Sequence, residues 1–338
     1  MLCVVRLLWI AVPIGIYTAT TPLFAINVSV DYTYDTSDFF GAGNPDGAMA
    51  GAMARNSLEA AAGYYSEILT DTFSSIHTPA TFYSGTFAGV FTWQWQLDFP
   101  NPYTGVTTTL YDQTIAEDEY RIYVGARSLS GSTLGEGGPG GWGWSGIPSG
   151  GGYTLEEINE INSITDEFAD AVAFRGEASG FANWGGALTF DSDGSTNWHY
   201  DHTTLPAAGE SDFLSVAIHD IGHSLGLGAS NTWDGLSSGT SFLGSIAVAE
   251  YGGPVPLDCD GSCTGHWKEG TASVIHGTST PQEAAMNPVV MLGKRSHLTD
   301  LDAAALADIG WSVSAVVPEP NSAVLMLLGI TLIMRRRF

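Results

Sequence analysis

Two histidines separated by three residues form the most distinctive chemical pattern in the chain. Residues 219–223 read HDIGH, inside a stretch, residues 211–227, whose apolar residues have helical spacing. Side chains at positions i and i+4 lie above one another on one helix face, so His219 and His223 can bind one Zn²⁺ ion together. Asp220, between them, is the candidate general base for a zinc-bound water. The pattern predicts a catalytic zinc site rather than two incidental histidines.

This segment resembles the metzincin zinc metallopeptidases, whose pattern is HExxHxxGxxH followed by a Met-turn. Gly226 stands at the position of the family glycine, where the helix ends. The chain departs from the pattern twice: Asp220 replaces the glutamate, and Ala229, which cannot bind metal, occupies the usual third-ligand position. Because Asp is one methylene shorter than Glu, its carboxylate retreats by about 1.5 Å. A displacement of about 1 Å can reduce a rate by roughly 100-fold, so activity depends on Asp220.

A long insertion separates the glycine from the third histidine in leishmanolysin-like metzincins. The resemblance therefore implies an insertion over residues 230–264, with His266 in the following segment, GHWKE, as the third zinc ligand. It also implies that Met286, in the segment MNP, forms the Met-turn beneath the metal. The residues alone leave other third ligands open, namely His199, His202, His276, His297 and Glu250.

The resemblance covers residues 154–312 and implies a zincin-type fold with an active-site helix and a C-terminal subdomain. Residues 186–191 resemble the matrixin edge strand, which pairs with an extended peptide or protein substrate. The apolar residues 289–292 follow the Met-turn position and are expected to line a specificity pocket. That pocket would favour apolar side chains after the scissile bond.

The helices and strands that must position these residues are predicted from hydrophobic spacing and from capping and helix-breaking residues. Residues 128–152, with eleven glycines in 25 residues, are expected to be a flexible surface insertion. Strands are predicted over residues 27–34, 91–99, 120–126 and 186–191. Helices are predicted over residues 58–69, 211–227 and 300–309, the last capped by Thr299. A further helix is predicted to begin after a capping box at Thr154. This order predicts an α+β fold with a twisted mixed sheet. Residues 26–153 would form the N-terminal part of the catalytic domain and residues 154–312 its metallopeptidase core.

Both ends of the chain have the composition of processing segments. Residues 1–25 are expected to be a secretory signal, with a short apolar run and a cut after Ala25. Residues 318–338 resemble the PEP-CTERM sorting signal: a Pro-Glu-Pro triplet, an apolar run and a terminal arginine cluster. That resemblance implies export, transient anchoring in the inner membrane, cleavage by an exosortase-type enzyme, and delivery to the cell surface or extracellular matrix. The alternative is a permanent tail anchor.

Charge and cysteine content limit the partners. Eleven Lys and Arg against 36 Asp and Glu give a net charge of −25, which repels phosphate backbones and excludes nucleic acid as a partner. Cys259 and Cys263 are expected to form a small-loop disulfide, the alternative being a two-thiolate metal site. Asp191 and Asp193 could hold Ca²⁺, although an Asx turn is the favoured interpretation.

These patterns together predict an exported zinc endopeptidase that hydrolyses peptide bonds with a zinc-activated water. The alternative is a zinc-binding pseudo-protease that holds extended chains at the surface or in a matrix. A structural matrix protein whose histidines bind metal only for stability is the third interpretation. Turnover separates the first function from the other two, and peptide binding without turnover separates the second from the third.

Overall fold

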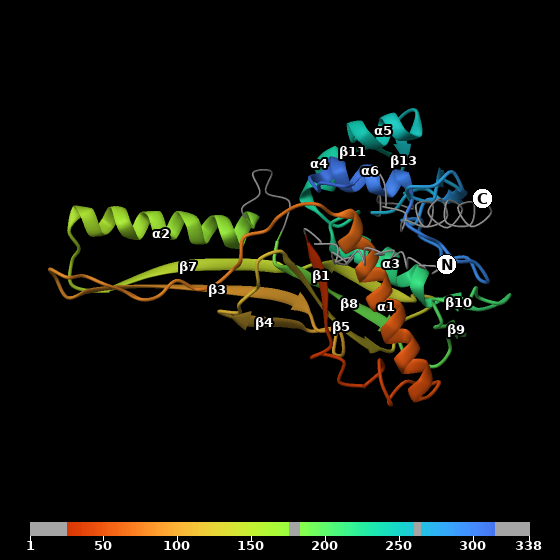
Figure 1. The fold of residues 1–338 in the computed structure, drawn as a ribbon, viewed down its shortest axis with the longest axis horizontal. Coiled ribbons are helices and arrows are strands. Elements are labelled where there is room, and N and C mark those ends of the chain that lie inside the picture. The colour runs from red at the N-terminus through yellow and green to blue at the C-terminus, as the bar shows by residue number, and fades with distance from the viewer. Residues whose placement is uncertain (1–25, 176–182, 260–264, 315–338) are drawn as a thin grey trace, which may run out of the picture.

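A computed structural model describes residues 26–175, 183–259 and 265–314, and Figure 1 shows its arrangement. It is a mixed structure of helices and several sheets, in agreement with the α+β prediction. The predicted secretory signal and the PEP-CTERM-like segment lie outside the described residues. Within the described ranges, no helix is long and apolar enough to cross a membrane.

A four-stranded sheet forms the centre of the body. Its order is β1 (Asn27–Asp31), β5 (Glu119–Arg127), β8 (Gly185–Asp191) and β6 (Gly135–Pro139). The first three strands are parallel and β6 is antiparallel to β8. The sequence predicted all three of these strands, although β1 ends at Asp31 rather than at residue 34, and the sheet is mixed as expected.

The predicted edge strand is not at an edge. All seven residues of β8 are buried, and the strand lies between β5 and β6. Strands that are covered on both faces read as apolar runs, which resemble edge strands when they are short. The expectation that residues 186–191 pair with a substrate is therefore wrong, and β6 forms that edge of the sheet instead.

Two helices pack against this sheet and against each other. Helix α1 (Ala48–Ile68) begins ten residues before the predicted helix, because its first turns are formed by alanine and glycine rather than by an apolar stripe. Helix α3 (Phe213–Ser224) carries the HDIGH segment, and all but two of its twelve residues are buried. Tyr65 on α1 donates a hydrogen bond of 2.8 Å to the carbonyl of Ile218 on α3, which fixes the two helices together.

An elongated arm projects from the body (Figure 1). Its sheet contains β2 (Phe82–Tyr83), β3 (Gly89–Pro100), β4 (Thr107–Tyr111) and β7 (Gly141–Gly150), and helix α2 (Leu155–Phe174) packs on it. The period-two prediction for β3 is confirmed. Trp93, Trp95, Leu97 and Phe99 alternate into a second hydrophobic cluster with α2.

The glycine-rich stretch is not a flexible insertion, so that expectation is wrong. It forms β6 and β7, and β7 pairs with β3 over ten residues. Its glycines allow close packing: a Cβ on Gly140 would lie 2.0 Å from the Trp184 ring. A Cβ on Gly137 would lie 2.4 Å from the Asp220 carbonyl, so β6 rests backbone to backbone on α3. Glycine content here reflects close approach of chains and not mobility.

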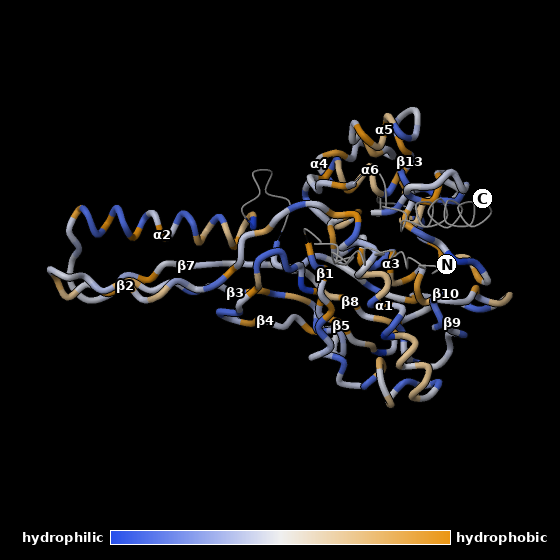
Figure 2. The backbone as a smooth tube through the Cα atoms, in the orientation of Figure 1, coloured by the Kyte–Doolittle hydropathy of each residue, from blue (hydrophilic) through white to orange (hydrophobic). Residues whose placement is uncertain are grey.

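Helix α2 begins as predicted, with the Thr154–Glu157 capping box present in full. Its inner half is buried through Ile161, Phe168 and Val172. Its first turns extend along the outer arm, where Leu155 is 75% and Ile158 41% exposed, so the predicted buried stripe is wrong at these two positions. Figure 2 shows the alternation of apolar and hydrophilic residues along the helix.

The C-terminal part of the chain covers the end of α3. It contains helices α4 (Asn231–Leu236), α5 (Ser245–Tyr251) and α6 (Asp300–Ile309). The predicted Thr299 cap and the stop at Gly310 are confirmed. The remaining strands are short pairs: β9 (Trp198–His199) with β10 (Ser211–Asp212), β11 (Ser237–Ser238) with β12 (Ser241–Phe242) and β13 (Val255–Pro256), and β14 (Ala272–Val274) with β15 (Pro281–Glu283).

Candidate metal centre

Helix α3 places His219 and His223 on one face and is fixed at its start. Asp212 caps the helix by accepting a hydrogen bond from the Ser215 amide, and Arg295 binds the same carboxylate through two nitrogens, at 2.7 and 3.0 Å. The Asp212 side chain is fully buried, so this pair leaves little freedom for the first turn. The helix is shorter than the predicted 211–227, because Leu225 is its C-cap and Gly226 has φ +102°.

Two glycines bring His266 to the end of α3. The chain leaves α3 at Gly228, passes through α4, α5 and the short strands, and returns at Gly265. A Cβ on Gly265 would lie 2.0 Å from the Gly228 carbonyl oxygen, and one on Gly228 would lie 1.8 Å from the Gly265 carbonyl oxygen. The two backbones are therefore in direct contact, which places His266 beside His223. The predicted insertion, residues 230–264, is the excursion between these glycines, of which residues 260–264 lie outside the described part.

Gly265→Ala is expected to weaken zinc binding without touching a ligand. The new methyl group meets a backbone oxygen that cannot rotate away, so the two segments must separate and His266 moves with them. We expect zinc affinity to fall by roughly 10-fold or more and stability by about 1–3 kcal/mol. Zinc competition titration and thermal unfolding measure both effects. Gly253→Ala is the matched control, because nothing lies within 4 Å of its Cβ. Equal zinc affinity in both variants would contradict this account.

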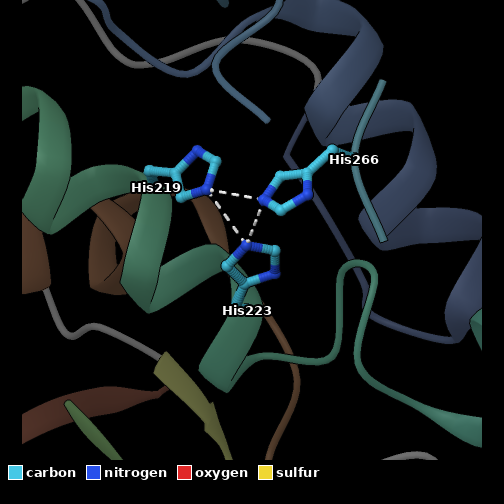
Figure 3. Close-up of side chains that lie close together, drawn as sticks. All are labelled: His219, His223 and His266. Atoms are coloured by element: carbon cyan, nitrogen blue, oxygen red, sulfur yellow. Dashed lines mark hydrogen bonds between the residues drawn. The ribbon is translucent and has the colours of Figure 1, made fainter. Parts of the chain in front are cut away.

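The three histidines converge on one point (Figure 3). Their Nε2 atoms lie 3.0 Å apart for His219 and His223, 3.0 Å for His223 and His266, and 3.2 Å for His219 and His266. A tetrahedral Zn²⁺ with bonds of about 2.0–2.1 Å holds its nitrogens about 3.3 Å apart. The triangle is therefore within about 0.3 Å of the size that this ion requires.

The second nitrogen of two rings identifies the tautomer. His219 Nδ1 lies 2.8 Å from the Ala285 carbonyl oxygen, and His223 Nδ1 lies 2.7 Å from the Leu227 carbonyl oxygen. A carbonyl oxygen can only accept, so both Nδ1 atoms carry the proton and both Nε2 atoms present lone pairs. Lone pairs that face one another at 3.0 Å repel unless a cation lies between them. The ring geometry thus fits a metal ion and does not fit a hydrogen-bonded histidine cluster.

Burial keeps the three rings neutral, which is the form that binds metal. Burial lowers the pKa of His219 to about 4 and that of His223 to about 3, and the neighbouring ring adds to each effect. The pKa of His266 falls to about 4 for the same reasons. Among the described residues, these three form the group of His, Cys, Asp or Glu whose ligand atoms all lie within 4.8 Å of one another.

The other candidate ligands lie outside this group, and two of them pair with carboxylates. His276 Nδ1 lies 2.7 Å from an Asp300 oxygen, and His199 Nδ1 lies 3.2 Å from a Glu210 oxygen. His202 and His297 do not join the group, and Glu250 lies exposed on α5. The structure therefore brings together His219, His223 and His266 and none of the alternatives.

Met286 lies directly behind the ligand helix. It is fully buried, and a Cβ on Gly222 would lie 2.7 Å from its sulfur. The preceding residue, Ala285, supplies the carbonyl that orients His219. The predicted Met-turn residue therefore sits beside the histidines, and Gly222 leaves the room that its sulfur occupies.

Asp302 is a positioning residue that the sequence did not reveal. Its buried carboxylate accepts hydrogen bonds from Trp267 Nε1 and from the Ala285 amide, both at 2.8 Å, and from Thr299 at the start of α6. It thereby links the His266 segment, the Met286 segment and the last helix. The capping pattern predicts only its bond to Thr299, because the other two partners come from distant parts of the chain.

Asp220 lies between α3 and β6 with its side chain packed against Gly135. A Cβ on Gly135 would lie 1.9 Å from Asp220 Oδ2, so any other residue at this position would displace the carboxyl group. The carboxyl is buried and Oδ2 has no hydrogen-bond partner among the described residues. Burial, and then the charge of Glu136, raise the pKa of Asp220 well above its usual range. The predicted base thus borders the cleft but does not join the ligand group.

The calcium prediction concerns the end of β8 and the turn after it, and the disulfide prediction concerns the segment after β13. Asp191 accepts from the Leu129 amide and from Thr196 Oγ1, each at 3.0 Å, and Asp193 accepts from the Ser195 amide at 2.7 Å. The Asp193 bond is that of the Asx turn that the sequence favoured, whereas the Asp191 bonds connect its carboxylate to the distant Leu129 amide and to the Thr196 side chain. Cys259 is disulfide-bonded, while Cys263, its predicted partner, lies outside the described residues.

A cleft of about 840 Å³ opens at the histidines. Residues 131–137, before and within β6, line one side, and residues 287–290 line another. Comparison with protein-family models, with curated proteins and with solved structures found no match to this chain. The chemistry of the site must therefore be judged from the residues and geometry described above.

Proposed function

We propose that this chain is an exported zinc-dependent endopeptidase of the metzincin type. The observation that carries the proposal is the convergence of three histidine Nε2 atoms at a cleft, two of them on an HxxxH helix with a buried methionine behind it. Three protein ligands leave the fourth tetrahedral position for water or substrate, as catalytic zinc sites do. The proposed fold is the zincin type, supported by a mixed sheet with an antiparallel edge strand beside the ligand helix.

His219, His223 and His266 would hold Zn²⁺, which polarises a substrate carbonyl and lowers the pKa of a bound water. Asp220 is the proposed base that would accept a proton from this water and the acid that would donate it to the leaving amine. The Ala285 and Leu227 carbonyls keep two of the rings in the tautomer that binds metal. Among the described residues, β6 pairs with β8 alone, so its outer edge could pair with an extended peptide, and peptide or protein chains are the proposed substrates.

A second cavity explains the proposed side-chain preference. It has a volume of about 700 Å³ and shares Asn287, Val289 and Val290 with the metal cleft. Its walls combine apolar side chains, Leu205, Pro206, Ile275 and Met291, with the charged residues Glu283, Lys294 and Arg295. If a substrate extends from the metal cleft toward these shared residues, the side chain after its scissile bond would enter this second cavity.

Cleavage is therefore expected before large apolar residues. Val290→Glu places a charge in the shared wall and should lower kcat/KM for such peptides by about 10-fold, which corresponds to roughly 1.4 kcal/mol. Val106→Glu is the control, because Val106 is 67% exposed in the turn between β3 and β4. Profiling with a mixed peptide set measures the preference. Charged residues after the cleaved bond would contradict it.

The second candidate function is a zinc-binding pseudo-protease that holds extended chains at a surface or in a matrix. The buried position of Asp220 favours it, because a carboxylate packed against Gly135 has little freedom to reach a metal-bound water. Export, exosortase-type processing and transient membrane anchoring belong to both candidates. They are supported by the sequence of residues 1–25 and 318–338.

The deciding experiment follows hydrolysis of an unfolded protein by the chain without residues 1–25 and 318–338. Turnover that a chelator abolishes and added zinc restores would establish the endopeptidase. One zinc per chain without turnover, on several substrates, would establish the pseudo-protease. A chain that binds no zinc would refute both.

A further inference from the structure

In the part of the chain that the structure describes, strand β7 leaves one long edge of the arm unpaired. It pairs with β3 on one side only, and eight of its ten residues are exposed. The strand contains no charged residue, and Trp142, Trp144 and Ile147 are each more than one-third exposed. Long, uncharged edge strands pair readily with another chain unless the protein covers or charges them.

The ladder shows which amides of β7 are free. Trp95 directs its N–H to Asp112 and accepts from the Asp112 amide, so its backbone faces β4. Neighbouring residues alternate in direction, so the backbones of Gln94 and Gln96 face β7 and bond to Ser145 and Gly143. The N–H groups of Trp142, Trp144 and Gly146 then point outward. Pro148, which has no N–H, has the same orientation, as expected for a proline on an edge strand.

The indoles lie beside this free edge, on the face that α2 covers. Trp144 lies opposite Trp95 in the ladder, and its ring contacts Phe168 of α2 at a centroid distance of 6.2 Å. Trp142 lies opposite Leu97 on the same face. A strand added to β7 would direct every second side chain to this face, next to the two indoles and the flank of α2.

The negative charge of the arm favours basic side chains on a strand added to β7. Residues 82–111 and 141–174 contain seven Asp and Glu and no Lys or Arg. Six of the acidic residues are on α2: Glu156, Glu157, Glu160, Asp166, Glu167 and Asp170. Lys or Arg side chains beside α2 would gain from this field and from the faces of the indoles. A second copy of the chain would instead bring two acidic α2 helices together.

We propose that the outer edge of β7 binds an extended, cationic segment of a partner polypeptide as an added strand. Main-chain bonds to Trp142, Trp144 and Gly146 supply the affinity, and the acidic flank with its indoles selects basic residues at alternate positions. Because none of the residues that line the metal cleft belongs to β7, the surface is separate from the proposed catalytic site.

The test uses two labelled eight-residue peptides in which Thr alternates with Lys or with Glu, and fluorescence anisotropy. We expect the Lys peptide to bind at least about 10-fold more tightly than the Glu peptide, with a difference that shrinks in high salt.

Trp144→Pro removes one outward N–H and should weaken binding by about 10-fold, whereas Trp144→Val keeps the N–H and should lose less affinity. Glu160→Lys should weaken binding, and Glu67→Lys, at an exposed position on helix α1, should not. His223→Ala should bind as the wild type does.

Several results would overturn the proposal. These are equal binding of both peptides, equal affinity of Trp144→Pro and Trp144→Val, or loss of binding in His223→Ala, which would place the peptide in the metal cleft. A dimer in sedimentation that Trp144→Pro dissociates would assign the edge to a second copy. If Trp144→Pro does not fold, amide exchange of the wild type decides. The Lys peptide should protect Trp142, Trp144 and Gly146, and unchanged exchange would refute the proposal.

Discussion

His266→Ala is expected to lower zinc affinity by at least about 100-fold and to remove any peptidase activity. Loss of outer-shell partners alone typically costs 10–100-fold in metal affinity, so loss of one of three ligands costs more. The remaining pair, His219 and His223, would keep weak binding because both rings project from one face of the helix, with their Nε2 atoms 3.0 Å apart. Zinc competition titration measures the effect directly.

His276→Ala is the matched control for this experiment. His276 is also buried, but its Nδ1 pairs with Asp300 at 2.7 Å at the start of α6. We expect this variant to lose stability and to keep wild-type zinc affinity. Unchanged zinc affinity in His266→Ala, or an equal loss in both variants, would show that the triad in the structure is not the metal site.

The contrast between the ligands shows what sequence can and cannot predict. His219 and His223 are related by the helical repeat, which is local, so their spacing alone places both rings on one face. His266 reaches them only because Gly228 and Gly265 let two distant backbones touch. No local pattern encodes that contact, and five alternatives stayed open until a family resemblance or a structure favoured one.

Glycine was the hardest residue to interpret from the sequence. In residues 128–152 its abundance indicated mobility, yet Gly135, Gly137 and Gly140 mark places where β6 rests on α3 or on Trp184. Missing Cβ atoms permit both freedom and close approach, and only the neighbours distinguish the two. The same ambiguity hid the edge strand, because β6 has too few side chains to show a period of two.

Helix-capping and amphipathic patterns predicted the structure more reliably than glycine content did. The boxes at Thr154 and Thr299 need only the four residues that form them, and both are present. The buried stripe of α2 was wrong at Leu155 and Ile158, because periodicity shows which face is apolar but not how far the covering sheet extends. Asp302 illustrates the same limit, since its cap is local and its bonds to Trp267 and Ala285 are not.

Asp220→Asn is expected to reduce turnover by about 100-fold or more while zinc content stays at one per chain. The amide has the same size as the carboxylate, so it fits against Gly135, but it cannot take a proton from the metal-bound water. General acid–base catalysis typically contributes 10²–10⁴-fold, which sets the scale of the loss. Metal analysis and steady-state kinetics on the same samples separate the two effects.

Asp220→Glu tests whether the shorter side chain of aspartate limits turnover in the wild type. Asp220 Oδ2 already lies where a Cβ on Gly135 would clash, so a longer side chain cannot extend in the same direction. The longer side chain must turn in another direction, and a turn toward the histidines would bring its carboxylate nearer to the metal centre. Higher turnover in Asp220→Glu would then show that reach limits the wild type. Loss of zinc and of stability together would show that the site is built around aspartate. Equal turnover in wild type and Asp220→Asn would remove Asp220 from the reaction and favour the binding protein.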